Sequence, residues 1–519
     1  MSQTRKILQG SASNVARIVL SMVVALVLPP LLVHHMEPAE YGAWVLILQC
    51  GGYVALLDFG LQTAVAKFVA EHAATDDRVA SSRVLSSSFA ILCISALIGA
   101  LVIVLIAWRV PQLFHQMPSS LIGDVRMGIL AIGLSTVVAL PFGSFLAVFM
   151  GLQRYGFPTV LSMFSKLLSS AVLAVLLLMH GKLVQLVWVV AAFNLATALG
   201  QFLGWKLYAS DRVDFGPRLA SRTTAVRLVK YSGVLSIWVI AGLLISGLDV
   251  LIVGHYDYKN TGYYGIASIV TNFMMLVIGG LFSPLVPAIS SLQTQQTPHH
   301  IGKLTIESTR YCTLLLTLIG LPLAFGAYPL LQLWVGHSYA TQSVSFLQIL
   351  ILGNVIRQLG YPYSLAVIAT GKQHLATIAA VAEATANICV SLYLVQRIGA
   401  IGVAIGTVCG AFVSIALHLT LSMRYTQSAI AISRRSFVMR GVVRPLLCLI
   451  PSLLLIPTWN RFAMLPWSIP WLGGWSTATL LIAWQVALTE TDRKRVITTL
   501  SRLARLDYVK GTYSGRSLA

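Results

Sequence analysis

A few charged side chains stand inside runs of apolar residues that are long enough to cross a bilayer. A charge at mid-bilayer costs about 2.5–3.5 kcal/mol on insertion, so such residues usually face a cavity or an oppositely charged partner. The basic members of this set suit the binding of an anionic substrate, and the acidic members suit coupling to an ion gradient. The basic members are Arg17, Lys166 and Arg357, and the acidic members are Asp58, Asp249 and Glu383.

Arg357 lies near the middle of the apolar run 341–370. A guanidinium there can bind a diphosphate through two parallel hydrogen bonds, which an ammonium cannot do. The alternative is a buried ion pair with Glu383 in the next run. Lys166 either contacts a phosphate or forms an ion pair that bridges two halves of the molecule. Arg17 either meets a diphosphate from the cytoplasmic side or extends its head group to the membrane surface.

Glu383 also lies in the middle of its apolar run. A carboxyl that is shielded from water can carry a proton, as relays in transporters require. Asp58 and Asp249 also lie within apolar runs, where a charged group usually faces a cavity or a partner. The alternative is that either aspartate caps a break in a helix, and Gly60 close to Asp58 favours such a break.

Composition indicates that transmembrane helices position these groups. Of the 519 residues, 57% are hydrophobic and 10% are charged, whereas an ordinary soluble domain has about 25% charged residues. A soluble chain of this length would need a polar surface, so lipid must cover most of this one. Apolar runs of about 20 residues predict an all-α integral membrane protein with about 14 transmembrane helices. The runs are 12–35, 41–70, 84–108, 123–150, 157–180, 184–208, 228–254, 262–292, 304–333, 341–370, 374–396, 400–424, 441–459 and 467–488.

The distribution of basic residues predicts the orientation of the chain. Most of the 36 Lys and Arg residues fall in the segments that share a side with the N-terminus, above all in 206–230, in 424–444 and in the tail from Arg493. Because such residues collect on the cytoplasmic side, both termini are predicted to be cytoplasmic. The segment Glu490–Arg505 alternates basic and apolar residues at helical spacing, which predicts an interfacial helix against anionic lipid. Tryptophans near predicted helix ends are expected at the membrane interface: they are Trp44, Trp108, Trp188, Trp205, Trp334, Trp467 and Trp471.

The chain contains a weak internal duplication at an offset of about 220 residues, in which short segments at 33–35, 40–43 and 151–154 match segments at 253–255, 262–265 and 371–374. Because each copy would hold six spans, both enter the membrane from the same side, which predicts parallel repeats about an axis along the membrane normal. The alternative is that short loops converge on Gly, Tyr and Lys. The predicted organisation is an N-lobe at 1–210, a basic cytoplasmic linker at 211–227, a C-lobe at 228–425, an extra helix pair at 426–488 and a basic tail at 489–519.

Several local patterns, in their order and spacing, resemble one family along nearly the whole chain. They are Glu40-Tyr41-Gly42, Leu57-Asp58-Phe59-Gly60-Leu61, Lys67-Phe68-Val69-Ala70-Glu71, Leu248-Asp249-Val250-Leu251-Ile252-Val253-Gly254, Gly262-Tyr263-Tyr264, Pro284-Leu285-Val286-Pro287-Ala288-Ile289-Ser290 and Gly399-Ala400-Ile401-Gly402-Val403-Ala404. With two lobes of six helices and a further pair, the sequence resembles the Wzx-type flippases. These form the polysaccharide-transport branch of the multidrug/oligosaccharidyl-lipid/polysaccharide exporter superfamily.

The resemblance implies a function and a set of partners. The chain would flip a polyprenyl-diphosphate-linked oligosaccharide across the bacterial inner membrane for O-antigen, capsule or exopolysaccharide assembly. It would work by alternating access driven by an ion gradient, as a monomer among membrane lipids, with a polysaccharide polymerase and chain-length machinery as partners. Relatives of this superfamily also export drugs or flip the peptidoglycan precursor, and these remain alternative functions.

The sequence holds no nucleophile–base constellation, metal cluster or nucleotide-binding loop, so no catalytic residue, metal or cofactor is predicted. A membrane glycosyltransferase or polymerase is the alternative of another class, and it would be expected to carry a large soluble loop or a polar catalytic segment. The net charge of +20 does not indicate nucleic-acid binding, because the basic residues are not interleaved with aromatic residues that could stack on bases.

Overall fold

The computed structural model describes residues 20–294, 297–449 and 468–482, together with Trp484, Gln485, Glu490, Arg493 and Thr498. These residues form helices joined by short turns, and no β-strand occurs among them. The predicted all-α fold class is therefore confirmed. The chain divides into two compact units: unit 1 comprises Met1–Phe273, Leu331–Asn354 and Thr377–Ser414, and unit 2 comprises Met274–Leu330, Val355–Ala376 and Ile415–Ala519.

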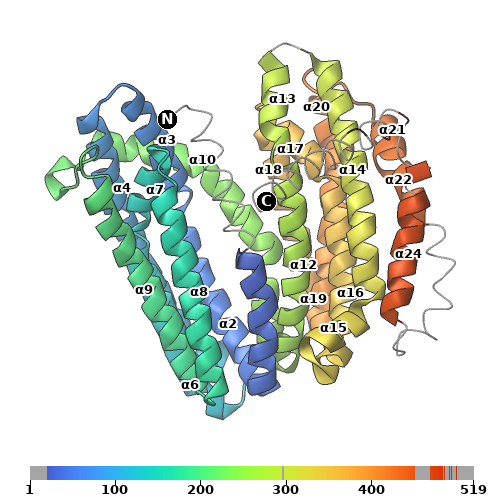
Figure 1. The fold of residues 1–519 in the computed structure, drawn as a ribbon, viewed down its shortest axis with the longest axis horizontal. Helices are drawn as coiled ribbons and strands as arrows, with labels where there is room; N and C mark the ends of the chain where they lie inside the picture. The colour runs from blue at the N-terminus through green and yellow to red at the C-terminus, as the bar shows by residue number, and fades with distance from the viewer. Residues whose placement is uncertain are drawn as a thin grey trace, which may run out of the picture. The chain divides into compact units, whose positions relative to one another are not determined.

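Helices account for nearly all of the described chain (Figure 1). After an apolar helix at Leu20–His35 come α2 (Pro38–Ala55), α3 (Leu61–Ala74), α4 (Arg78–Trp108), α5 (Val110–Leu113), α6 (Ser119–Ala139), α7 (Gly143–Gly151), α8 (Gly156–Leu178), α9 (Leu183–Tyr208), α10 (Arg222–Ser246), α11 (Asp249–Tyr256) and α12 (Thr261–Phe282). They are followed by α13 (Leu285–Thr294), α14 (Pro298–Phe325), α15 (Ala327–Val335), α16 (His337–Leu359), α17 (Tyr361–Ala369), α18 (Gln373–Ile398), α19 (Ala400–Leu417) and α24 (Ser468–Ile482), with short helical turns between α19 and α24.

Ten helical stretches of the described residues are long and apolar enough to cross a bilayer. They correspond to the predicted second to sixth and eighth to twelfth spans. The seventh predicted span is the pair α10 and α11, which is interrupted after Ser246. The first span and the last two lie partly outside the described residues, so the total of about 14 stays a prediction.

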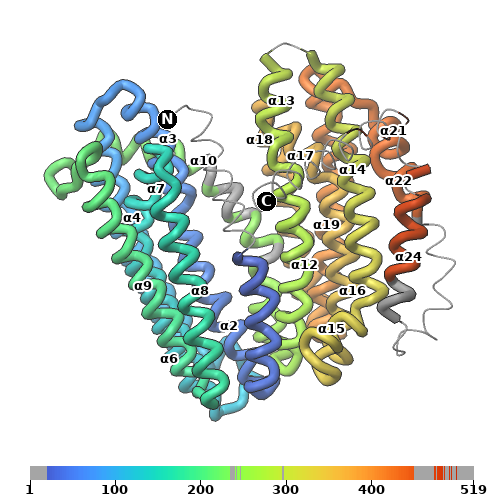
Figure 2. The backbone as a smooth tube through the Cα atoms, in the orientation of Figure 1, coloured from blue at the N-terminus to red at the C-terminus, as the bar shows by residue number. Residues whose placement is uncertain are grey.

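Unit 1 contains a bundle in which α6 packs against α2, α4 and α9, while α3 packs against α4 and α7. Figure 2 shows α8 and α9 as neighbouring tubes, in agreement with their contacts. Phe145 on α7 lies at the centre of an aromatic cluster with ring-centroid distances of 5.1 Å to Trp205 and 5.2 Å to Phe202. The burial of these rings fixes α7 against α9.

Two of the tryptophans expected at the membrane interface are buried in unit 1 instead. Trp44 is 3% exposed and Trp205 is 7% exposed, whereas Trp108 and Trp188 are 63% and 54% exposed. The prediction of a position at the membrane interface is therefore wrong for Trp44 and Trp205. The reason is clear for Trp205, because its indole Nε1 donates to the carbonyl of Val213 at 3.1 Å. This satisfies the polar atom without water.

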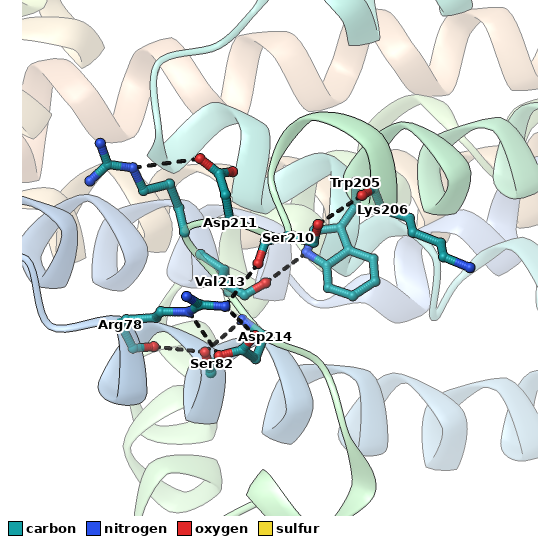
Figure 3. A network of polar contacts seen from close by, with 9 residues as sticks. Arg78, Ser82, Trp205, Lys206, Ser210, Asp211, Val213 and Asp214 are labelled. Atoms are coloured by element: carbon teal, nitrogen blue, oxygen red, sulfur yellow. Dashed lines mark hydrogen bonds and ion pairs between the residues drawn. The ribbon is translucent and has the colours of Figure 1, made fainter.

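The linker between α9 and α10 is bound tightly to the N-terminal half of α4 (Figure 3). Arg78 donates to both carboxylate oxygens of Asp214, at 2.9 and 2.6 Å. Ser82 Oγ accepts from the backbone N–H of Asp214 at 2.7 Å, and Ser87 Oγ accepts from that of Ser221 at 2.9 Å. The linker is thus part of unit 1, and two of its backbone N–H groups donate to serine hydroxyls of α4.

α2 and α12 approach each other closely at Gly42 and Gly262, which are separated by 220 residues, the offset of the predicted duplication. A methyl group placed on Gly42 would lie 3.5 Å from the nitrogen of Gly262, and one on Gly262 would lie 3.4 Å from the nitrogen of Gly42. The pattern repeats one turn away: Gly42 faces the carbonyl of Tyr258, and Gly262 faces that of Pro38. Gly42 and Gly262 are 220 residues apart, and so are Pro38 and Tyr258. Such reciprocal contacts are expected where a twofold axis passes between equivalent elements.

Unit 2 is built around α14, which packs against α13, α17, α24 and the π-helical turn Phe437–Val443. Thr305, Thr309 and Thr313 form a buried stripe on α14, and each hydroxyl donates to the carbonyl four residues earlier. Thr313 also donates to the carbonyl of Gly441 at 2.9 Å. Small side chains that satisfy their own hydroxyls allow this close packing of helices.

Candidate functional site

The interruption between α10 and α11 is the feature from which the site is built. A break in a helix leaves carbonyl groups without their usual N–H partners. Here side chains from other helices supply the donors: Gln49 Nε2 donates to the carbonyl of Gly247 at 3.0 Å, and Tyr53 also donates to that oxygen. From α18, Asn387 Nδ2 donates to the carbonyl of Ile245 at 2.7 Å. The break is therefore held by α2 and by α18.

Asp249 begins the second half of the broken helix and is only 6% exposed. Its carboxylate accepts hydrogen bonds from Tyr264 at 3.1 Å, from Thr407 at 3.1 Å and from Asn387 at 3.3 Å. These donors come from α12, α19 and α18. The carboxylate thus lies at a helix N-terminus and accepts from hydroxyl and amide donors of three other helices.

The network continues along α18 at the spacing of one helical turn. Ser391 donates to Asn387 Oδ1 at 3.0 Å and to the carbonyl of Val403 at 3.3 Å. Glu383, one turn before Asn387, is 3% exposed. Residues four apart lie on one face of a helix, so Glu383 belongs to the same polar stripe as Asn387 and Ser391. Asp249 thus contacts Asn387, and Glu383 lies one turn before Asn387 on α18.

A cavity of about 350 Å³ lies in unit 1 and contains Lys166 in its lining. Three helices each contribute one face, at the intervals of three and four residues that a helical face requires. The polar groups of the lining are Ser21, Gln49, Lys166, Ser268 and Asn272; the others are Val24, Ala25, Leu28, Pro29, Leu32, Tyr41, Trp44, Val45, Leu48, Val250, Gly265 and Ile269. Lys166 Nζ donates to Ser21 Oγ at 3.0 Å.

The cavity and the buried network share the broken helix. Gln49 lines the cavity and also binds the carbonyl of Gly247, and Val250, which follows Asp249, lines the cavity as well. A change in the hydrogen bonds of Asp249 therefore has a direct path to the cavity wall.

Asp58 lies at a second helix break, between α2 and α3. Phe59 and Gly60 both have positive φ, at 49° and 73°, so the chain turns sharply there. The carboxylate of Asp58 accepts from the backbone N–H of Gln62 at 3.3 and 3.4 Å in the first turn of α3. The structure thus shows the capping arrangement that Gly60 suggested. A role of Asp58 in ion coupling stays a prediction.

Two further basic candidates were predicted from the sequence. Arg357 is half-buried in the last turn of α16 and belongs to unit 2, and Arg17 lies outside the described residues. Their roles, and the pairing of Arg357 with Glu383, stay predictions. Asn387, Thr407 and Tyr264 are not among the site residues predicted from the sequence. The i, i+4 spacing of Glu383 and Asn387 within an apolar run was the signal that could have found the first of these.

Comparison with known proteins identifies the family. A family model described as polysaccharide biosynthesis protein matches residues 7–293, more than half of the chain, and the protein belongs to this family. No curated protein matches the chain in sequence.

Solved structures show the fold. The chain is similar to a multidrug resistance MATE family transporter of the MOP superfamily in an inward-facing conformation, with a TM-score of 0.63 and 15% identity over 79% of this chain and 95% of that one. It is also similar to the lipid II flippase MurJ in an inward closed conformation, with a TM-score of 0.69 and 14% identity over 92% of this chain and 97% of that one. A transporter of the MOP superfamily from Pyrococcus furiosus has a TM-score of 0.52 at 14% identity, over 82% and 96% of the two chains.

The resemblance predicted from the sequence patterns is therefore confirmed. Family and fold together indicate a multi-pass membrane protein of the polysaccharide biosynthesis family with the fold of the solved transporters.

Proposed function

We propose that this protein flips a polyprenyl-diphosphate-linked oligosaccharide from the inner to the outer leaflet of the bacterial inner membrane, as a step in the assembly of O-antigen, capsule or exopolysaccharide. The observation that carries the proposal is the cavity around Lys166, which combines one cationic group with apolar faces of three helices. The family description, polysaccharide biosynthesis protein, supports the same substrate class.

The chemistry of such a substrate matches the cavity. A diphosphate needs compensating positive charge when it leaves water, and an ammonium within reach of a hydroxyl supplies it. The polyprenyl chain needs apolar surface, which Leu28, Leu48 and Ile269 offer. In this proposal Lys166 holds the diphosphate in the cavity, while Arg17 and Arg357 bind it at other stages of the cycle. The bulky glycan needs mainly a wide and hydrated path.

Coupling to an ion gradient is proposed to act through Asp249 and Glu383. A cation or proton that binds near Asp249 would compete with the hydrogen bonds from Asn387, Thr407 and Tyr264, because one carboxylate oxygen serves two of these donors. Since Asn387 also holds the carbonyl of Ile245, such a change would loosen the break between α10 and α11. Gln49 would transmit that change to the cavity.

The proposed transport cycle is alternating access with both termini in the cytoplasm. In this scheme the ion and the substrate each favour one of two conformations, and their coupling is the difference between those preferences. Asp58 is the third acidic candidate, acting through the α2–α3 break that it caps. A polysaccharide polymerase and chain-length machinery would receive the flipped substrate.

Deletion of the gene tests the proposal. The expected result is lipid-linked glycan stranded in the inner leaflet and the loss of one surface polysaccharide, with drug resistance unchanged. Re-expression of the wild-type chain should restore the polysaccharide, and re-expression of Lys166→Ala at equal protein level should not. The reverse pattern, loss of drug resistance with normal surface glycan, would assign the chain to drug export. Failure of cell-wall synthesis would assign it to the peptidoglycan precursor.

A further inference from the structure

A second cavity of unit 1, with a volume of about 140 Å³, lies where α3 ends and α4 and α10 begin. It is distinct from the cavity around Lys166, because the two share no residue. Its polar lining is predominantly basic. The lining residues are His72, Arg83, Thr224 and Arg227, together with Phe68, Ala80, Val84 and Leu228.

The guanidinium of Arg227 is held in place at this cavity. It lies 4.5 Å from the ring centroid of Phe68 and 3.9 Å from a carboxylate oxygen of Glu71. Lys67 lies 3.6 Å from the same carboxylate group. One acidic group thus serves two cations, so Glu71 leaves positive charge uncompensated there.

Arg83 adds a further positive charge. Among the described residues, no acidic side chain lies within ion-pairing distance of Arg83 or of His72. The nearby carboxylate of Asp77 accepts from the backbone N–H of Ala80 at 2.8 Å and so caps α4. The cavity therefore has the charge and the donors to bind an anion with several oxygens.

A neighbouring cavity shows that this imbalance is local. That cavity, of about 460 Å³, is also lined by charged side chains, including Arg78, Arg154 and Arg212. Each of these arginines forms an ion pair, with Asp214, Asp211 and Asp76 respectively. Because its arginines are already paired, this neighbouring cavity has no comparable excess of positive charge that would attract an external anion.

Exposed apolar side chains beside the basic cavity indicate the source of the anion. Val79 lies one turn before Arg83 on α4 and is 55% exposed, while Val226 and Val229 flank Arg227 on α10 and are 47% and 51% exposed. A free phosphate ion would gain nothing from these side chains, whereas the acyl chains of a lipid would cover them. Basic pockets at the ends of transmembrane helices are typical binding sites for anionic head groups.

We propose that Arg83, Arg227 and His72 bind the phosphate group of an anionic phospholipid, and that this lipid fastens α10 to α3 and α4. The proposal does not depend on the substrate of transport. It concerns a bilayer lipid that is retained and not carried across the membrane.

The test is lipid binding to the purified full-length protein, measured by native mass spectrometry and by titration with phosphatidylglycerol or phosphatidylcholine in mixed micelles. The wild type should bind phosphatidylglycerol in preference. Arg83→Ala with Arg227→Ala should weaken that binding about 25-fold, at about fivefold for each basic group. Lys206→Ala with Arg218→Ala is the matched control, since it removes two exposed basic side chains of the same unit, and it should keep the preference.

The variants Arg83→Lys and Arg227→Lys, combined, retain charge and should bind with intermediate affinity, which guards against misfolding of the alanine variant. Equal losses in the test and control pairs would overturn the proposal, because a nonspecific surface charge would then explain binding. Undiminished preference in the alanine pair would overturn it as well. Binding of inorganic phosphate at millimolar concentration without any preference for phosphatidylglycerol would show that the cavity takes the free ion, and would also refute the lipid assignment.

Discussion

Replacement of Asp249 by asparagine should damage both stability and coupling, because the surrounding donors leave no good place for an amide. The oxygen of the new side chain can still accept from Tyr264 and Thr407. Its NH₂ group then faces Asn387 Nδ2, which lies 3.3 Å from the carboxylate in the native chain. Asn387 cannot simply turn over, because its Nδ2 also donates to Ile245 at 2.7 Å and its Oδ1 accepts from Ser391 at 3.0 Å.

One buried donor is therefore left without an acceptor in Asp249→Asn, at a cost of about 1–3 kcal/mol in the free energy of unfolding. The melting temperature of the purified protein should fall measurably. Flipping of lipid-linked oligosaccharide in reconstituted vesicles should lose its response to an imposed Na⁺ or pH gradient. Asp76→Asn is the control, since the side chain of Asp76 is 87% exposed, and its effect should stay within about 0.5 kcal/mol.

The double variant Asp249→Asn with Asn387→Asp returns an acceptor opposite the new NH₂ group. It should recover part of the lost stability, but not all, because residue 387 can then no longer donate to Ile245. An unchanged melting temperature together with an unchanged gradient response in Asp249→Asn would refute the reasoning. It would mean that the carboxylate is neither a structural acceptor nor part of the coupling.

Further predictions concern the helix approach and the remaining charges. Gly262→Ala should lower the melting temperature, by about 1–3 kcal/mol of stability, because the added methyl would lie 3.1 Å from a side chain of α2. Gly42→Ala, with 3.5 Å available, should be tolerated in the same measurement. Lys166→Ala should abolish surface polysaccharide at normal protein level. Arg357→Ala should also abolish it, and Arg357→Lys should retain part if charge alone matters; full export by well-expressed Arg357→Ala would exclude the assigned role. Glu383→Gln should lose ion dependence in vesicles yet still bind substrate.

Much of the architecture could be read from local sequence. Apolar runs between basic segments suffice to predict a multi-pass helical protein, because each bilayer crossing must satisfy its own backbone and bury about 20 apolar residues. The internal duplication stays a prediction, and its match of 40–43 with 262–265 has an offset of 222 residues. The reciprocal glycine contacts instead pair 42 with 262, at the same offset as the other two matches.

The acidic candidates show where sequence reasoning ends. An aspartate in an apolar run indicates that it must find partners, because its desolvation is costly. The partners themselves lie far along the chain, and Asp249 meets Asn387 and Thr407 only through the packing of three helices. Asp58, by contrast, caps the next helix through Gln62, four residues away. This capping arrangement could be predicted from the local sequence, because Gly60 lies close to Asp58.

The sequence by itself determined the membrane class, the helical composition and the identity of the charges that must be compensated. These follow from the transfer free energy of side chains, which each residue carries regardless of its neighbours. Tertiary structure alone decided which helix faces line the cavity around Lys166, why Trp205 is buried, and how Gln49 joins that cavity to the broken helix of Asp249. Such arrangements depend on contacts between residues far apart in the chain, and helical periodicity gives the face of a residue but not the helix that it meets.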